Sequence, residues 1–400
     1  MRIGMMADAY KPHVSGVTNV ISLSKRFLEK AGYEVYVFTF GGGDYQDDEP
    51  NIVRTRGMQL IDTGLYFSAR HSSEAQKILR TMDIIHVHHP FTSGQLAIRY
   101  CRAQGIPLVF TNHTRYDLYA HAYLPMVPEA LGDAFLKAYL PSFCKACDLV
   151  IAPSPGLQQV LIKLGVEAEI EVIPNGVDIR PFESVDQPIP REQLGFKEDD
   201  VILTYMGRIG IEKNLPFLLR AFAGIAGTYE NVGLLIIGDG ADRENLEDRV
   251  RIMGISDRVH FTGMIPYQEL PAYMKVADAF VTASVTEVHP LSVIEALASG
   301  LPVVGIQSPG VGDTIEDGVT GYLAPEEDLA VFTAKLSRMV TDRDEREKMA
   351  IQAAETAKIY SIENTTQTMI DRYQKLYLEY AGRKRSFFHR VTRPFRRTKN

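Results

Sequence analysis

Two glutamates eight positions apart, Glu287 and Glu295, are the residues of this sequence most suggestive of chemistry. They lie in the run TEVHPLSVIEALASG, where Pro290 and Gly300 are preferred entry and exit residues of a short helix. Glu287 is therefore predicted in the loop before the helix, and Glu295 inside it. The helix N-terminus between them offers free backbone N–H groups to a phosphate. One carboxylate could bind a sugar and the other a ribose, as in a nucleotide-sugar site. The alternative is two acids flanking an ordinary surface helix.

Two cations follow an earlier apolar strand, in the run GRIGIEKNLPFLLRAF. Arg208 is predicted at the strand end and Lys213 at the start of a helix for which Asn214 is a suitable N-cap. Such a pair can hold a diphosphate and neutralise a leaving group without a metal. The alternative is a pair of solvated charges. In the run IIGDG, Gly238 and Gly240 would let a loop approach a nucleotide, or they form a plain turn.

The first half of the chain carries histidines at predicted strand ends. His113 follows the strand LVFTN, at the edge where ligands bind in parallel sheets. His86 and His88 would share one strand face, but no carboxylate or cysteine accompanies them, so we expect no metal site. Gly16, after the first strand, would let the backbone pass close to phosphates, or it is a simple turn glycine.

Strands and helices that must position these residues alternate in two successive halves. This alternation indicates parallel βαβ units and an α/β fold with a doubly wound sheet in each half. After the first strand we predict strands at 34–40, 84–88, 108–111, 149–152, 201–206, 233–237, 259–262, 279–282 and 303–305. Predicted helices span 18–31, 215–226, 325–341 and 362–380.

The domains predicted from this pattern are 1–175 and 199–361, joined by a proline-rich linker at 176–198. A C-terminal helix at about 362–382 would complete the first domain. Two such domains facing each other would leave a central cleft along the carboxyl ends of their strands.

Composition restricts the class of protein. At 400 residues the chain has room for roughly two to three domains. No stretch reaches the ~18 apolar residues of a membrane-spanning helix, and Asp8 interrupts any signal peptide, so we expect a cytoplasmic protein. Three cysteines agree with a reducing compartment, and the pair Cys144 and Cys147 lacks the second pair that a four-cysteine zinc site requires.

The final segment, 383–400, has eight Lys/Arg and no acid, whereas the whole chain has a net charge of −7. Phenylalanines 387, 388 and 395 interleave with these cations. The combination suits an anionic bilayer surface, where each basic residue contributes roughly 1 kcal/mol. We expect a disordered tail that binds membranes, because the acidic remainder of the chain argues against nucleic acid. A solvated tail without function is the alternative.

The motifs VIPNGVD, MGRIGIEKN, IIGDG and the Glu287/Glu295 pair, in this order, resemble the retaining GT-B glycosyltransferases along essentially the whole chain. These enzymes have two Rossmann-like domains and transfer a sugar from a nucleotide donor. The resemblance implies that Arg208 and Lys213 bind the donor diphosphate. It further implies that Glu295 binds the ribose and Glu287 the sugar.

The resemblance extends to the base, for which Ile265 would offer its backbone. It also has departures. Pro290 stands near the position where the family usually has a glycine, and it lacks an N–H, so a phosphate contact there must come from a neighbour such as Leu291. Asp313 stands where glutamate is common.

The segment NHTRYDLYAHAY is similar to that of bacterial diacylglycerol glycosyltransferases in the same family. This implies that His113 touches the transferred sugar and helps to orient the acceptor. Aromatic residues from Tyr116 to Phe143 would shape a groove for a lipid headgroup, although several of them suit an ordinary helix core.

The sequence thus predicts a metal-independent, retaining enzyme that transfers glucose from UDP-glucose to diacylglycerol. It would lie on the inner face of the cell membrane, bound through 383–400. One alternative uses GDP-mannose with phosphatidylinositol or a soluble glycan as acceptor. Another is a non-catalytic sugar-nucleotide-binding protein that docks on membranes.

Overall fold

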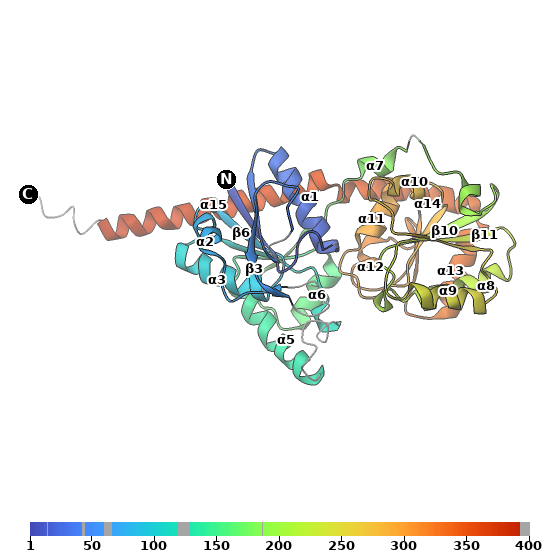
Figure 1. Ribbon diagram of the computed structural model, residues 1–400, viewed down its shortest axis with the longest axis horizontal. Helices are drawn as coiled ribbons and strands as arrows, with labels where there is room; N and C mark the ends of the chain where they lie inside the picture. The colour runs from blue at the N-terminus through green and yellow to red at the C-terminus, as the bar shows by residue number, and fades with distance from the viewer. Residues whose placement is uncertain (14, 42–44, 60–65, 119–128, 186, 393–400) are drawn as a thin grey trace, which may run out of the picture. The chain divides into compact units, whose positions relative to one another are not determined.

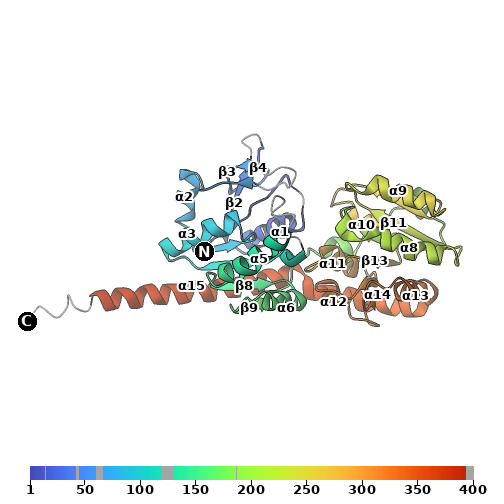
Figure 2. The same ribbon diagram turned by 90° about the horizontal axis from the view of Figure 1, so that it is seen from below.

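The computed structural model describes residues 1–400 except 14, 42–44, 60–65, 119–128, 186 and 393–400; at 59, 129–133 and 383–392 it describes the backbone alone. The chain forms two compact units. The first comprises Met1–Pro153, Gln158–Ile173 and the chain from Glu363 on, and the second comprises Ser154–Leu157 and Pro174–Ile362. Figures 1 and 2 show both units from two directions.

The first unit is built on a parallel seven-stranded sheet of order β3-β2-β1-β6-β7-β8-β9. Buried, largely apolar strands covered on both faces are typical of such sheets. The strands are β1 (Arg2–Met6), β2 (Glu34–Gly41), β3 (Ile52–Arg56), β6 (Ile84–Val87), β7 (Leu108–Thr111), β8 (Leu149–Ala152) and β9 (Ile170–Val172), and a separate two-stranded sheet pairs β4 (Met58–Gln59) with β5 (Tyr66–Phe67). The helices are α1 (Gly16–Lys30), α2 (Ser73–Leu79), α3 (Thr92–Gln104), α5 (Glu129–Cys144), α6 (Pro155–Lys163) and α15 (Ile362–Thr392).

Helices α1 and α15 share one core with this sheet. Ile21 of α1 and Ile370 and Tyr373 of α15 are buried in a cluster with apolar residues of the strands. Figure 1 shows α15 as the long red helix that lies along the first unit. Helix α5 packs elsewhere on the sheet, where Phe143 meets the ring of Phe110 edge to face at 5.0 Å.

The second unit repeats the plan with a parallel six-stranded sheet of order β12-β11-β10-β13-β14-β15. Its strands are β10 (Val201–Met206), β11 (Val232–Ile237), β12 (Val259–Gly263), β13 (Ala279–Val281), β14 (Val303–Ile306) and β15 (Gly321–Ala324). One core cluster joins the sheet to α8 (Leu215–Ala226), α9 (Arg243–Ile252) and α13 (Leu329–Thr341). A second cluster joins it to α7 (Arg180–Glu183), α10 (Leu270–Met274), α11 (Leu291–Ala298) and α14 (Arg343–Ala357). The remaining elements are short: α12 (Val311–Thr314) and the 3₁₀ turns η1 (Arg191–Leu194), η2 (Ile211–Lys213) and η3 (Lys358–Tyr360).

Three predictions from the sequence need correction. Residues 176–198, predicted as the interdomain linker, belong to the second unit, because Phe182, Leu194 and Phe196 are buried in its core. The predicted disorder of 383–400 is wrong for 383–392, which continue α15; the last eight residues lie outside the described part of the chain. Asn214 is the N-cap residue of α8, as predicted, but its side chain does not cap the helix, since the backbone is left-handed (φ 53°) and the side-chain amide donates to Glu327 at 3.0 Å.

Among the described residues, no helix is both long and apolar enough to cross a bilayer.

Candidate active site

The second unit places two of the predicted motifs side by side at one point of its sheet. Strands β10 and β13 are neighbours, although β11 and β12 separate them in sequence. Loops that leave such neighbouring strands run in opposite directions, and the crevice at their carboxyl ends is the usual ligand site of an open parallel sheet. Arg208 and Lys213 follow β10, and Glu287 follows β13.

Lys213 and Glu287 are in direct contact at this point. Lys213 Nζ lies 2.5 Å from Glu287 Oε1, and about one fifth of each side chain is exposed. Sequence reasoning placed the two residues in separate motifs with separate tasks. The contact puts the ammonium group predicted for a phosphate beside the carboxylate predicted for a sugar.

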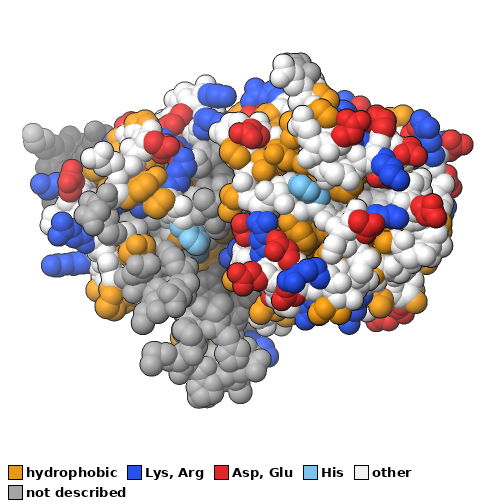
Figure 3. Space-filling model, turned by 45° about the vertical axis from the view of Figure 1, so that its right-hand side comes forward, with side chains coloured by type: hydrophobic (Ala, Val, Ile, Leu, Met, Phe, Trp, Pro, Cys, Tyr) orange, Lys and Arg blue, Asp and Glu red, His pale blue; other side chains and the backbone are white. Residues whose placement is uncertain are grey.

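Arg208 pairs with a different carboxylate. Its Nη2 donates to Glu212 Oε1 at 2.6 Å, and 72% of the Arg208 side chain is exposed. Burial opposes the ionised form of Glu212, but a bond from its own backbone N–H and the Arg208 guanidinium keep its pKa below the usual value. That Arg208 and Lys213 converge on one anion stays a prediction, because each is held here by its own glutamate. On the face shown in Figure 3, acidic and basic side chains lie close together over the second unit.

Helix α11 begins immediately after this loop. Pro290 is its N-cap, with an extended backbone and no side-chain cap, and Leu291 is its first residue. Val293 and Ile294 donate their N–H groups to the Pro290 carbonyl oxygen, whereas the N–H groups of Leu291 and Ser292 form no backbone hydrogen bond among the described residues. Gly300 lies just beyond the end with φ 72°, a backbone that favours glycine. The predicted bounds of this helix are confirmed. That Leu291 contacts a phosphate stays a prediction.

Glu295 lies in the second turn of α11 and is 7% exposed. Tyr267 donates its hydroxyl to Glu295 Oε1 at 2.9 Å. Burial raises the pKa of Glu295 to about 7, although the bond from Tyr267 lowers it. Tyr267 is 45% exposed, and Ile265, two residues before it, packs against the same core as α11. A carboxyl group whose pKa lies near 7 is partly ionised at neutral pH, and its ionised form can accept hydrogen bonds from the hydroxyls of a ribose.

Two of the glycines serve internal packing. A Cβ at Gly238 would lie 2.0 Å from the Gly207 carbonyl oxygen, and one at Gly240 would lie 2.1 Å from that of Ile209. Both positions therefore need glycine so that the loop after β11 can approach the loop after β10.

Asp313, which stands where the family commonly has glutamate, accepts a hydrogen bond from the backbone N–H of Gly310 at 3.0 Å.

In the first unit, His113 follows β7 and is 9% exposed. Its Nε2 lies 2.9 Å from His88 Nδ1, and the two rings stack at 5.2 Å. His86 and His88 do share one side of β6, with ring centroids 4.2 Å apart, as the spacing predicts. Burial lowers the pKa of His113 to about 3, so the imidazole is neutral near pH 7.

Asp8 is a buried carboxylate of the first unit that no sequence motif singled out as a site residue. It accepts from Ser93 at the start of α3, at 2.6 Å from the backbone N and 2.5 Å from the side-chain Oγ. Burial raises the pKa of Asp8 to about 6, although these hydrogen bonds lower it.

A Cβ added at Gly16, the first residue of α1, would meet no described atom within 4 Å, so packing within the described chain does not require glycine there. Tyr116 and Phe143 are buried core residues, at 1% and 2% exposure.

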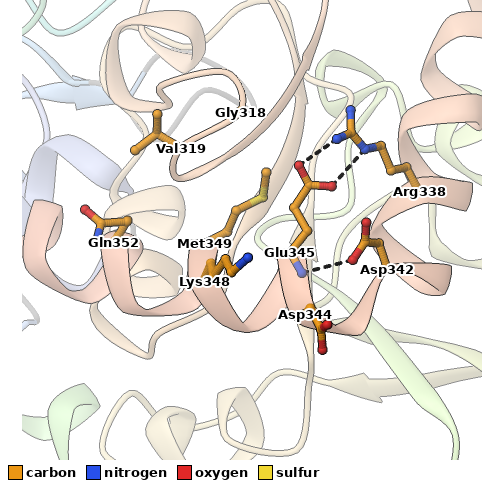
Figure 4. A pocket seen from close by; sticks show the side chains of 9 residues that line it. All are labelled: Gly318, Val319, Arg338, Asp342, Asp344, Glu345, Lys348, Met349 and Gln352. Atoms are coloured by element: carbon orange, nitrogen blue, oxygen red, sulfur yellow. Dashed lines mark hydrogen bonds and ion pairs between the residues drawn. The ribbon is translucent and has the colours of Figure 1, made fainter.

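The second unit has a surface pocket whose lining includes none of the candidate site residues (Figure 4). It is formed by α13, α14 and the turn before the edge strand β15. Arg338 and Glu345 form two hydrogen bonds across it, at 2.8 and 2.7 Å, and so neutralise each other. No group of three metal-ligating side chains occurs within the part of the chain that the structure describes.

Two doubly wound, Rossmann-like units, each with polar residues at the carboxyl ends of its strands, define a protein of the GT-B architecture. Comparison with known proteins agrees. Residues 14–180 match the model of Glycosyltransferase Family 4, and residues 186–356 match that of Glycosyl transferases group 1.

Among relatives, the chain is 34% identical to an alpha-monoglucosyldiacylglycerol synthase of Streptococcus pneumoniae, over 82% of this chain and 77% of the relative. It is 30% identical to the protein of that name from Acholeplasma laidlawii, over 80% and 84%. Sucrose-phosphate synthase from Thermosynechococcus elongatus has a similar structure, with a TM-score of 0.75 at 22% identity over 94% of this chain and 99% of that one. The chain belongs to the GT-B glycosyltransferases with these family 4 and group 1 domains.

Proposed function

We propose that this glycosyltransferase moves glucose from UDP-glucose onto 1,2-diacylglycerol with retention of the anomeric configuration. The observation that carries the proposal is the contact of Lys213 with Glu287 at 2.5 Å, beside the N-terminus of α11. Cation, carboxylate and free N–H groups together suit a sugar joined to phosphate. The two relatives named for monoglucosyldiacylglycerol synthesis support the lipid acceptor.

In this proposal the donor lies against the second unit. Lys213, Arg208 and the N–H of Leu291 bind the diphosphate, and Glu295 accepts from the ribose hydroxyls. Ile265 offers its backbone to the base, and Glu287 binds the sugar. Arg208 must leave Glu212 to reach a phosphate, which its exposed position allows. Donor binding then exchanges ion pairs within the protein for ion pairs with the ligand.

The reaction breaks the bond between the anomeric carbon and the phosphate oxygen and forms one to the acceptor hydroxyl oxygen. Positive charge develops at the anomeric carbon and negative charge on the departing phosphate, which Lys213, Arg208 and the start of α11 stabilise. The proton of the acceptor hydroxyl passes to a leaving phosphate oxygen on the same face of the sugar. His113, as a neutral imidazole, contacts the sugar through a hydrogen bond.

The enzyme must reach its diacylglycerol acceptor at a membrane. We propose that the basic segment 383–400 holds the enzyme peripherally on an anionic surface, on the inner face of the cell membrane. Because 383–392 continue α15, the basic residues would extend from a helix that is anchored in the first unit.

The test is transfer of radiolabelled sugar by the full chain, with UDP-glucose or GDP-mannose as donor, in anionic liposomes with and without diacylglycerol. We expect a labelled lipid only with UDP-glucose and only with diacylglycerol. Labelled lipid from GDP-mannose would replace the donor in the proposal, and donor consumption without labelled lipid would replace the acceptor. Donor binding without turnover in every arm would favour a non-catalytic protein.

A further inference from the structure

Three buried histidines of the first unit form a stack. His86 lies on β6, His88 follows it, and His113 follows the neighbouring strand β7. The ring of His88 packs against both others: its centroid lies 4.2 Å from that of His86, with the rings tilted by 33°, and 5.2 Å from that of His113, with the rings stacked. Exposed fractions of the three side chains are 4%, 2% and 9% for His86, His88 and His113.

His86 is fixed from both sides. Its Nδ1 lies 2.6 Å from the Tyr373 hydroxyl on α15, and its Nε2 lies 2.7 Å from Thr111 Oγ1 on β7. Both ring nitrogens are therefore used, and the ring provides a rigid base on which His88 packs.

The side chain of His88 has one hydrogen bond within the described part of the chain. Its Nδ1 meets His113 Nε2 at 2.9 Å, whereas its own Nε2 is fully buried without a partner. His113 Nδ1 forms no hydrogen bond among the described residues and is not one of their fully buried, unpartnered atoms. Nδ1 is thus the nitrogen that His113 can offer to a ligand.

Neither ring is charged near pH 7. Burial holds the pKa of His88 well below its usual value and that of His113 at about 3, and the neighbouring histidines add to both shifts. Two neutral imidazoles share a single proton across a bond from Nδ1 to Nε2. If His113 donated that proton, the second nitrogen of His88 would be a buried N–H without an acceptor, which is rare and costs about 1–3 kcal/mol. If His88 donates, only a lone pair is left without a partner.

We propose that His88 is a positioning residue that donates its Nδ1–H to His113 Nε2 and so fixes the tautomer of His113. In that tautomer His113 carries its proton on Nδ1 and presents a neutral N–H donor to an oxygen of the transferred sugar. This inference rests on the proposed function for the ligand, but the tautomer itself does not depend on turnover. It also explains why a histidine with an unpartnered nitrogen is buried at this point of the sheet.

The first experiment reads the tautomer directly. Nitrogen-15 ring spectra of the full chain, assigned with His113→Gln and His88→Gln, report which nitrogen of each histidine carries the proton. We expect His88 and His113 both protonated at Nδ1 in the wild type. A wild-type His113 protonated at Nε2, or a His113 tautomer that is unchanged in a folded His88→Leu variant, would overturn the proposal.

The second experiment separates positioning from mere packing. The amide of asparagine lies as many bonds from Cα as His Nδ1, whereas that of glutamine reaches the position of Nε2. We expect His88→Asn to keep most of the transfer activity, and His88→Gln and His88→Leu to lose about 10- to 100-fold in kcat. His71→Leu is the matched control, because His71 is equally buried in the first unit with an unpartnered Nε2 and lies outside the stack.

The positioning role would be overturned if His88→Asn lost as much transfer activity as His88→Leu. It would also be overturned if the control His71→Leu showed a loss of that size. In a His113→Ala background, His88→Leu is expected to cause no further loss, since the two residues act through one hydrogen bond. If the wild type transfers no sugar to any acceptor, the proposed function fails, and the spectra alone decide the tautomer.

Discussion

Donor affinity is expected to depend on the protonation of Glu295. Burial raises its pKa from 4.5 to about 7, and only the ionised carboxylate can accept from both hydroxyls of a ribose while donating nothing. At pH 6 a carboxyl group with this pKa is ionised in about one molecule in ten. Binding to the ionised form alone therefore predicts a roughly tenfold weaker affinity at pH 6 than at pH 8.

The same shift predicts an effect on stability with the opposite trend. Because the folded-state pKa lies above the ordinary value, the folded state binds more protons than the unfolded state between pH 4.5 and 7. The contribution of Glu295 to the free energy of unfolding is therefore fully present below pH 4.5 and is lost as the pH rises through 7. The change amounts to about 3 kcal/mol. Glu295→Gln removes the ionisation and is expected to raise the melting temperature at pH 8.

The assay is calorimetric titration with UDP-glucose, whose disubstituted diphosphate has only strongly acidic groups and does not titrate in this range. Glu295→Gln should bind more weakly at pH 8 and show no pH dependence between pH 6 and 8. Tyr267→Phe removes the hydroxyl that lowers the pKa, so its midpoint should move to higher pH. A wild-type affinity that is constant from pH 6 to 8 would refute the reasoning.

Three further predictions concern other residues. Lys213→Ala should weaken UDP-glucose binding by about 10- to 100-fold, because a charge-assisted hydrogen bond is lost; Lys335→Ala, which removes an ion pair with Asp317 and a cation–π contact with Tyr322, should bind as the wild type does in the same titration. Asp8→Ala should lower the free energy of unfolding by about 1–3 kcal/mol in urea titrations, because Ser93 at the start of α3 loses its acceptor; an unchanged midpoint would contradict this. Deleting 383–400 should weaken sedimentation with anionic liposomes at low salt while activity on detergent-solubilised acceptor survives, and unchanged sedimentation would exclude the segment as the membrane contact.

The regular elements were largely predictable where a strand is buried and apolar. Strands β7, β8 and β10 have the predicted bounds, and α8 begins and ends as predicted. Strand β3, Ile52–Arg56, was missed because this edge strand carries two arginines and has no apolar run. The four prolines near 176–198 suggested a linker. Two phenylalanines in that range are instead buried in the core of the second unit and pack the segment against it.

The candidate site was predictable as a set of residues but not as a set of contacts. Glu287 and Lys213 are 74 positions apart, and only the order of β10 and β13 in the sheet brings them together. Tyr267 was missed because it lies outside the motifs, and Glu212 because no role was assigned to it within MGRIGIEKN. Each matters through one hydrogen bond to a predicted residue. From the sequence, His88 was considered only as a possible metal ligand. Its contact with His113 was missed because His113 follows a different strand.

The central claim is that the chain joins glucose to diacylglycerol with retention. The most direct measurement is proton NMR of the glycolipid that the purified full chain forms from UDP-glucose and diacylglycerol. Because the donor is an α-glycoside, we predict an α-linked glucose, recognised by the small coupling of an equatorial anomeric proton. A β-linked product would contradict retention, and the absence of any glucosylated diacylglycerol would contradict the account as a whole.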